Sequence, residues 1–214
     1  MPNFYSYVMP RDFGFAPNPF GKYCTLATCK PQIRGRAKVG DWVFGTTSLF
    51  GGAYPKLIYA MKVSEILTFD MYYADERFQA KKALMNGSLK TMYGDNIYHH
   101  SSDGSWLQDN SHHSLENGET NILNLNRDTA TDKVLISEEF YYFGCNAIAI
   151  PTELEENFCK KGIGYRTVEE KVAKSMLDLV AVEVRKMAEV SGDESRYMGD
   201  PASFLGKFQR YNGK

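Results

Sequence analysis

Short segments rich in aromatic residues alternate with turns in the first part of this chain, and this alternation constrains the fold most. Residues 4–8 hold three aromatic side chains and are followed by Pro10, which cannot donate a hydrogen bond to a neighbouring strand. Residues 11–21 contain two prolines and two glycines, so they are predicted to form turns. Rings crowded onto short strands favour a small curved sheet, and we expect a small β-barrel.

Further segments have strand composition, and the last third has helical periodicity. We expect strands at 23–30, 42–45, 57–67, 134–137 and 140–143, a turn at Gly51-Gly52, and a helix over about 70–84 with Asp70 as its N-cap. One apolar stripe at helical spacing predicts a long, core-facing C-terminal helix. The stripe consists of Val172, Met176, Leu179, Val180, Val184 and Met187.

These elements predict an α+β fold in one domain, residues 1–214. A small mixed barrel with flanking helices would occupy 1–150, and the polar, turn-rich residues 86–131 would form a long loop region within it. A helical C-terminal extension would follow over 151–214. This extension is expected to serve either formation of a homodimer or docking of a partner.

Composition narrows the classes of protein. The chain is 43% hydrophobic and 24% charged, has no apolar run of about 18 residues, and begins without a basic and apolar leader, so we expect a cytoplasmic protein without a membrane partner. The four cysteines form no zinc spacing and are interpreted as reduced, packed thiols. No metal or cofactor is expected.

Charge is unevenly distributed along a chain of net charge −1. Residues 1–40 carry six basic side chains and one acidic one, which favours a local anionic ligand over a protein that coats DNA. A solvated basic loop explains the same charge. Rings and cations interleave here, and stacking a base on an aromatic face contributes about 1–3 kcal/mol. The candidate ligand-binding residues are Tyr5, Tyr7, Arg11, Phe13, Phe15 and Lys30; alternatively, the rings fill the core.

The four histidines lie within fifteen residues, as the pairs His99-His100 and His112-His113. Imidazoles can act as general bases or metal ligands, but the spacing fits no established metal signature. Exposed loop histidines are the alternative interpretation. If one of them acts chemically, His100 or His113 is the candidate. The sequence lacks a phosphate-binding glycine loop, a dinucleotide fingerprint, a Gly-x-Ser-x-Gly elbow and the zinc deaminase pattern.

Several motifs together resemble the second of the nucleotide modification associated domain families, over most of the chain up to about Leu154. The motifs are Tyr5-Ser6-Tyr7-Val8-Met9-Pro10-Arg11-Asp12 with Gly-Phe-Ala-Pro-Asn-Pro-Phe at 14–20, Cys24-Thr25-Leu26-Ala27-Thr28-Cys29-Lys30-Pro31, Gly94-Asp95-Asn96-Ile97-Tyr98, and Val134-Leu135-Ile136-Ser137 with Phe140, Tyr142, Phe143 and Gly144. The resemblance implies an association with bacterial and phage systems that modify DNA bases.

The order of Gly40-Asp41-Trp42-Val43 and the segments 61–67 and 70–78 is also similar to the EVE and ASCH group of PUA-like barrels. That likeness implies a modified base or RNA held in an aromatic pocket. Carried over by position, Trp42 and Tyr98 are candidate pocket rings, and Asn18 in the N-terminal motif is a further ligand-binding candidate.

Three functions are compatible with these features. The leading one is recognition of a nucleotide or a modified nucleic acid base. The second is an enzyme acting on such a molecule, with Asp12, His100 or His113 transferring protons, either with or without a metal. The third is a defence or counter-defence protein that binds a small signalling nucleotide.

Overall fold

The computed structural model describes residues 1–48, 54–192, 195–204 and 206–211, so the turn expected at Gly51-Gly52 lies outside the described residues. The chain forms two compact units that are interleaved in the sequence. Unit 1 consists of Met1–Asp12, Ala37–Ser64 and Ser137–Ala202. Unit 2 consists of Phe13–Arg36, Glu65–Ile136 and Ser203–Lys214.

Unit 1 is built on a six-stranded sheet whose path is β10-β4-β3-β1-β11, with β9 also pairing with β4. Its strands are β1 (Phe4–Val8), β3 (Trp42–Thr46), β4 (Lys56–Lys62), β9 (Glu139–Tyr142), β10 (Ile148–Ala149) and β11 (Tyr165–Thr167). Strands β1 and β3 run parallel, with Phe4 opposite Trp42, whereas the other pairs are antiparallel. The strands expected at 4–8, 42–45 and 140–143 are confirmed.

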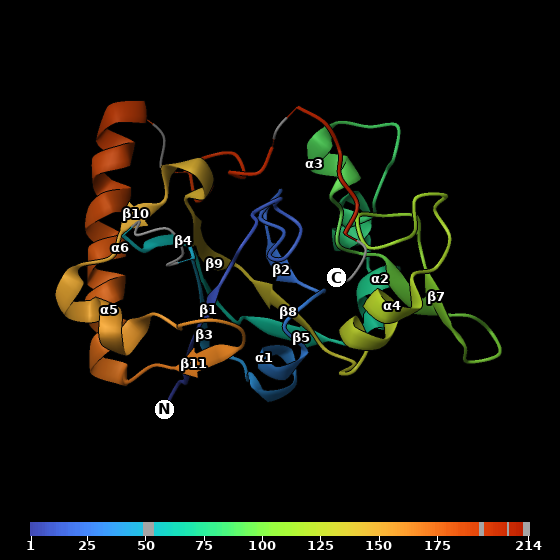
Figure 1. Cartoon of the computed structure of the whole chain (residues 1–214), viewed down its shortest axis with the longest axis horizontal. Helices are drawn as coiled ribbons and strands as arrows, with labels where there is room; N and C mark the ends of the chain where they lie inside the picture. The colour runs from blue at the N-terminus through green and yellow to red at the C-terminus, as the bar shows by residue number, and fades with distance from the viewer. Residues whose placement is uncertain (49–53, 193–194, 205, 212–214) are drawn as a thin grey trace. The chain divides into compact units, whose positions relative to one another are not determined.

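The helices of unit 1 are η2 (Gly144–Asn146), α5 (Thr152–Phe158) and the long α6 (Glu170–Ser191), which Figure 1 shows in orange and red. The predicted apolar stripe is confirmed, because Met176 and Val180 are buried against Phe44 and Phe158. No described helix is both long and apolar enough to cross a membrane. A homodimer through this segment stays a prediction.

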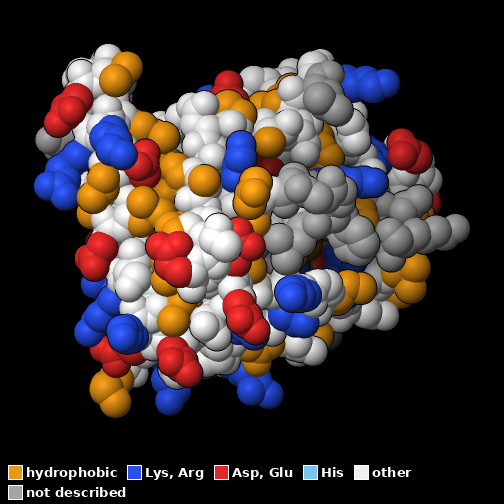
Figure 2. Space-filling model, turned by 60° about the vertical axis from the view of Figure 1, so that its left-hand side comes forward, with side chains coloured by type: hydrophobic (Ala, Val, Ile, Leu, Met, Phe, Trp, Pro, Cys, Tyr) orange, Lys and Arg blue, Asp and Glu red, His pale blue; other side chains and the backbone are white. Residues whose placement is uncertain are grey.

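Charge is mixed on the face that Figure 2 brings forward. Among the described side chains on this face, basic and acidic ones are interspersed with hydrophobic ones and form no continuous basic stripe. Sequence-independent binding to duplex DNA depends on many phosphate contacts from such a stripe. The described part of this face therefore does not present such a stripe.

Unit 2 has a three-stranded sheet of order β2-β8-β5 and a separate hairpin, β6 with β7. The strands are β2 (Cys24–Leu26), β5 (Glu65–Leu67), β6 (Tyr98–His100), β7 (Trp106–Gln108) and β8 (Val134–Ser137), of which Ser137 is assigned to unit 1. The helices are α1 (Pro31–Arg36), α2 (Phe69–Ala74), η1 (Glu76–Lys81), α3 (Leu89–Met92) and α4 (Ile122–Asp128).

The α+β class is confirmed, but the expected PUA-like barrel is not found, because no sheet closes among the described residues. The segment 57–67 is split into β4 and β5, which pair in different sheets. The turn-rich region expected at 86–131 contains α3, β6, β7 and α4, joined by segments without regular structure. The helix expected at 70–84 begins at Phe69 after the N-cap Thr68 and becomes a 3-10 helix after Asp75.

Gly94 lets two backbone segments approach closely inside unit 2. A Cβ at this position would lie 2.4 Å from the Lys81 carbonyl oxygen and 2.7 Å from the Ala83 nitrogen. The next residue, Asp95, is buried and accepts hydrogen bonds from Thr25 Oγ1 at 2.7 Å and Tyr72 Oη at 2.8 Å. The close contact at Gly94 therefore fixes the position of the Asp95 carboxylate. This carboxylate binds Thr25 of β2, the strand that precedes the candidate site.

We predict that Gly94→Ala lowers the free energy of unfolding by roughly 1–3 kcal/mol, because backbone atoms must move to admit the methyl group. Urea unfolding followed by circular dichroism measures the change. Gly35→Ala is the matched control, since the nearest atom to its Cβ would be Thr131 Oγ1 at 3.5 Å. Equal stabilities of the two variants would contradict the prediction.

Candidate functional site

Cys29 lies at a strained turn between β2 and α1. Cys29 and Lys30 have φ angles of 56° and 41°, the only non-glycine residues with positive φ among those described. Bulky L-residues rarely adopt this region, and such outliers concentrate at functional sites. The turn is held from two sides: the Cys29 amide donates to Asp128 Oδ1 at 3.0 Å, and Arg34 Nε donates to the Cys29 carbonyl at 2.8 Å. The strand expected over 23–30 therefore ends at Leu26.

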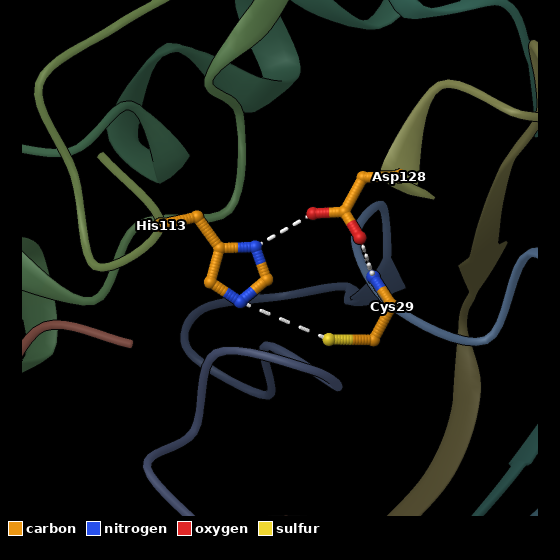
Figure 3. A group of neighbouring side chains, drawn as sticks. All are labelled: Cys29, His113 and Asp128. Carbon is orange, nitrogen blue, oxygen red and sulfur yellow. Dashed lines mark hydrogen bonds and ion pairs between the residues drawn. The ribbon is translucent and has the colours of Figure 1, made fainter. Parts of the chain in front are cut away.

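The Cys29 side chain forms a line with a histidine and an aspartate, as Figure 3 shows. Its Sγ lies 3.9 Å from His113 Nε2, and the other ring nitrogen, Nδ1, lies 2.6 Å from Asp128 Oδ2. The His113 and Asp128 side chains are 2% and 0% exposed, whereas Cys29 is half-buried. Cys29 is therefore the least buried residue of the three.

Asp128, the last residue of α4, is hydrogen-bonded on both oxygens. Oδ1 accepts from the Cys29 amide at 3.0 Å and from Arg127 Nε at 3.2 Å. Oδ2 accepts from Tyr98 Oη at 3.0 Å and from His113 at 2.6 Å. A buried carboxylate without donors would be very costly, and these four donors offset that cost.

Backbone and side-chain contacts fix the orientation of His113, which lies between β7 and α4. Its carbonyl accepts from Gln108 Nε2 at 3.1 Å and from Asn124 Nδ2 at 2.8 Å. Gln108 Nε2 also donates to Tyr98 Oη at 3.0 Å, and thus connects the histidine backbone to the donor on Asp128. The ring is therefore preorganised, with Nε2 towards the sulfur.

Electrostatics keep His113 charged and Asp128 ionised. Burial opposes the charge on His113, but the attraction of Asp128, with a contribution from Cys29, outweighs it and raises the pKa to about 9. Burial likewise opposes ionisation of Asp128, but His113, Arg127 and Arg34 outweigh it and lower that pKa to about 2. At neutral pH the pair is an imidazolium and a carboxylate.

This geometry matches a nucleophile, a proton-transfer group and a group that orients it. The same three side chains also offer ligand atoms within 4.8 Å of one another, as a metal site would. The carboxylate, however, already accepts four hydrogen bonds, and cations surround it. A divalent cation would have to displace those donors, so the residues fit a proton-transfer site better than a metal centre.

The chain matches the family model of nucleotide modification associated domain 2 over residues 1–207, which include all three residues of this line. The chain belongs to this family. No curated protein and no solved structure matches this family member. The resemblance drawn from the sequence motifs to the second nucleotide modification associated domain family is thus confirmed, and with it an association with nucleotide modification.

Some of the residues predicted to bind ligand or to act in catalysis lie in unit 1, whereas Cys29, His113 and Asp128 lie in unit 2. Most of these residues contact other side chains of unit 1. Tyr5 packs edge-on against Tyr165, Tyr7 accepts a hydrogen bond from Tyr59 Oη at 2.9 Å, and Trp42 stacks on Phe44. Asp12 is buried and accepts from Tyr142 Oη at 2.6 Å, while Arg11 is exposed. Their roles in ligand binding or catalysis stay predictions.

Other predicted residues lie in unit 2, and one of them, Phe15, packs against the His113 ring. The Phe15 ring centroid is 4.5 Å from that of His113, Phe13 stacks on Tyr93, and Tyr98 binds Asp128. Lys30 is adjacent to Cys29, whereas Asn18 accepts from the buried Lys81 at 2.8 Å. His100 pairs instead with the partly exposed Asp70 at 2.9 Å.

The sequence interpretation did not identify Cys29 or Asp128 as functional residues. No local pattern distinguishes Cys29 from the other cysteines, so the sequence alone predicts a packed thiol there. The usable signal was a cysteine after a short strand and before a helix, with histidine and aspartate elsewhere in the chain. Because the three residues are 84 and 15 positions apart in sequence, only the fold brings them together.

The His113–Asp128 pair predicts a specific dependence of stability on pH. The pKa of His113 is raised from 6.5 to about 9, so its contribution is complete below pH 6.5 and is lost as the pH rises towards 9. The pKa of Asp128 is lowered from 3.8 to about 2, so its contribution is lost as the pH falls through that range. Between pH 6.5 and 9 we expect the loss of up to about 3 kcal/mol of unfolding free energy.

Urea unfolding of the wild type and His113→Gln across this range tests the dependence. The variant should be less stable near pH 6 and should lose little more towards pH 9. His100→Gln is the matched control and should decline as the wild type does, because its partly exposed pair contributes little. An unchanged decline in His113→Gln would refute the assignment.

Proposed function

We propose that this protein is an enzyme of nucleotide modification that acts through a covalent intermediate on Cys29. The observation that carries the proposal is the line from Cys29 Sγ through His113 to Asp128, with distances of 3.9 and 2.6 Å. Nucleophiles in such sites are activated by an adjacent proton-transfer group that a third residue orients. The distance from sulfur to nitrogen is long for a hydrogen bond, as is common before substrate binds.

The charge on His113 determines which partner acts first. A protonated imidazole stabilises a neighbouring thiolate, which is the nucleophilic form of cysteine. In the first step the thiolate attacks an unsaturated carbon of the substrate and forms an S–C bond. His113 gives its Nε2 proton to the leaving amine or alcohol as the bond from carbon to that group breaks.

The second step regenerates the enzyme. His113, now neutral, takes a proton from water as the water oxygen attacks the same carbon. The S–C bond breaks, the sulfur leaves as thiolate, and His113 again carries its proton. The net reaction is hydrolysis, or transfer where a second nucleophile replaces water. Asp128 stays ionised throughout and holds Nδ1–H.

Family membership supports the substrate class. The family is associated with nucleotide modification, so we infer that the reacting carbon belongs to a nucleobase or to a group attached to one. Acyl, amide and amidine carbons of such bases are suitable electrophiles for a thiolate.

An activated ester tests the chemistry without knowledge of the natural substrate. Given p-nitrophenyl acetate, the wild type should release p-nitrophenolate and carry an acetyl group on Cys29, measured by absorbance and peptide mass spectrometry. Cys29→Ser should abolish the adduct at this position, and His113→Gln should slow its turnover by about 100-fold or more. Cys145→Ser is the control, because Cys145 is an exposed cysteine outside the line. Wild-type turnover in Cys29→Ser would exclude the proposal.

Recognition of a nucleotide or a modified base without turnover is the second candidate. Aromatic rings around His113 favour it, because Phe15 and Tyr211 have centroids 4.5 and 5.5 Å from the imidazole. Thermal shift with nucleotides and modified nucleosides, together with product analysis, separates the two. Stabilisation of both the wild type and Cys29→Ser, with no product from either, would select recognition.

A further inference from the structure

One guanidinium nitrogen of Arg127, whose Nε binds Asp128, has no hydrogen-bond partner among the described residues. Arg127 Nη2 is buried and makes no hydrogen bond in the described part of the chain. Arg127 Nε donates to Asp128 Oδ1 at 3.2 Å, and its guanidinium carbon lies 5.3 Å from the centre of the Tyr211 ring. The group is therefore held in place while one of its N–H edges is unused.

A buried N–H group without a hydrogen-bond acceptor, such as Arg127 Nη2, needs a physical explanation. Leaving a buried donor unsatisfied costs about 1–3 kcal/mol, and more for a charged group. Native proteins keep few such groups, and a ligand is one of the explanations. The location next to the proposed nucleophile indicates that the acceptor is part of the substrate.

The charges around Cys29 lead to the same conclusion. Among the described side chains, Asp128 is the carboxylate of this cluster, and it faces the cations His113, Arg127 and Arg34. Even with Cys29 as a thiolate, positive charge is in excess. Burying surplus charge is unfavourable, and an anionic ligand would neutralise it.

Arg34 is not available for this role. It is fully buried, and it donates to the carbonyls of Cys29, Asp128 and Lys133. Its function is to hold the turn. Arg127 differs, because Nε is its only nitrogen with a described hydrogen bond, and its side chain as a whole is 32% exposed although Nη2 itself is buried.

We propose that Arg127 Nη2 binds a phosphate oxygen of the substrate, so that the site takes a mononucleotide in preference to a nucleoside. This inference rests on the proposed function and specifies its substrate. Arginine suits a phosphate because its planar N–H groups match the oxygen geometry. A mononucleotide fits better than a polymer, because one recessed guanidinium supplies one phosphate contact whereas polymer binding needs many.

The rates at which a negatively charged and a neutral reagent alkylate Cys29 measure the preference of the site for anions. Iodoacetate and iodoacetamide have nearly the same shape but differ in charge. In the full chain, Cys29 should react with iodoacetate in preference to iodoacetamide when each rate is divided by that of the exposed Cys145. Arg127→Gln should lower this preference about tenfold, which corresponds to roughly 1.4 kcal/mol. Peptide mass mapping gives the rates.

Matched variants separate the specific contact from general electrostatics. Arg36→Gln removes an exposed charge from α1 in the same unit and should leave the preference unchanged. Arg127→Lys should retain part of it. The same preference in wild type and Arg127→Gln, or no preference in the wild type, overturns the proposal.

Ligand binding gives a readout that does not depend on the thiol. Deoxynucleoside monophosphates should raise the melting temperature of the wild type and of Cys29→Ser, but not of Arg127→Gln, and the matching nucleosides should shift none of them. Equal shifts in Arg127→Gln, equal shifts with nucleosides, or no shift in the wild type would overturn the phosphate contact. Absence of ester turnover by the wild type would instead overturn the covalent mechanism. Failure of the phosphate contact and failure of the covalent mechanism are therefore distinguishable.

Discussion

The Asp128 carboxylate organises the candidate site. Its two oxygens accept four hydrogen bonds, and these come from the turn at Cys29, the hairpin residue Tyr98, the loop residue His113 and its own neighbour Arg127. A fully buried charge is tolerated only when it is paired and hydrogen-bonded, so none of these segments can move independently. Stability of unit 2 and geometry of the site therefore depend on the same interaction.

The hydrogen bond to Asp128 also helps to hold the strained backbone at Cys29. Two consecutive residues with positive φ are unfavourable for bulky side chains, and the surrounding contacts have to hold them. Arg34 does so through the Cys29 carbonyl, one of four carbonyl groups to which it donates, and Asp128 does so through the Cys29 amide. These contacts fix the backbone of Cys29, whose Sγ lies 3.9 Å from His113 Nε2.

The fold was predictable where local pattern decides it. Alternating aromatic residues identified β1, and helical spacing from Val172 to Met187 identified α6. The barrel was not found, because closure depends on which strands pair, and a segment such as 57–67 contributes to two sheets. Of the site, His113 and Tyr98 were among the candidates, whereas Cys29 and Asp128 have no local signature that sets them apart.

The sequence by itself determined the α+β class, the principal strands, the C-terminal helix and, through its motifs, the family. These properties follow from side-chain periodicity and short motifs, which act over a few residues. Only the tertiary structure decided that Cys29, His113 and Asp128 meet, that Asp128 is saturated with donors, and that Arg127 has one edge unused. Burial and long-range hydrogen bonding create these features, and neither is encoded at any single position of the chain.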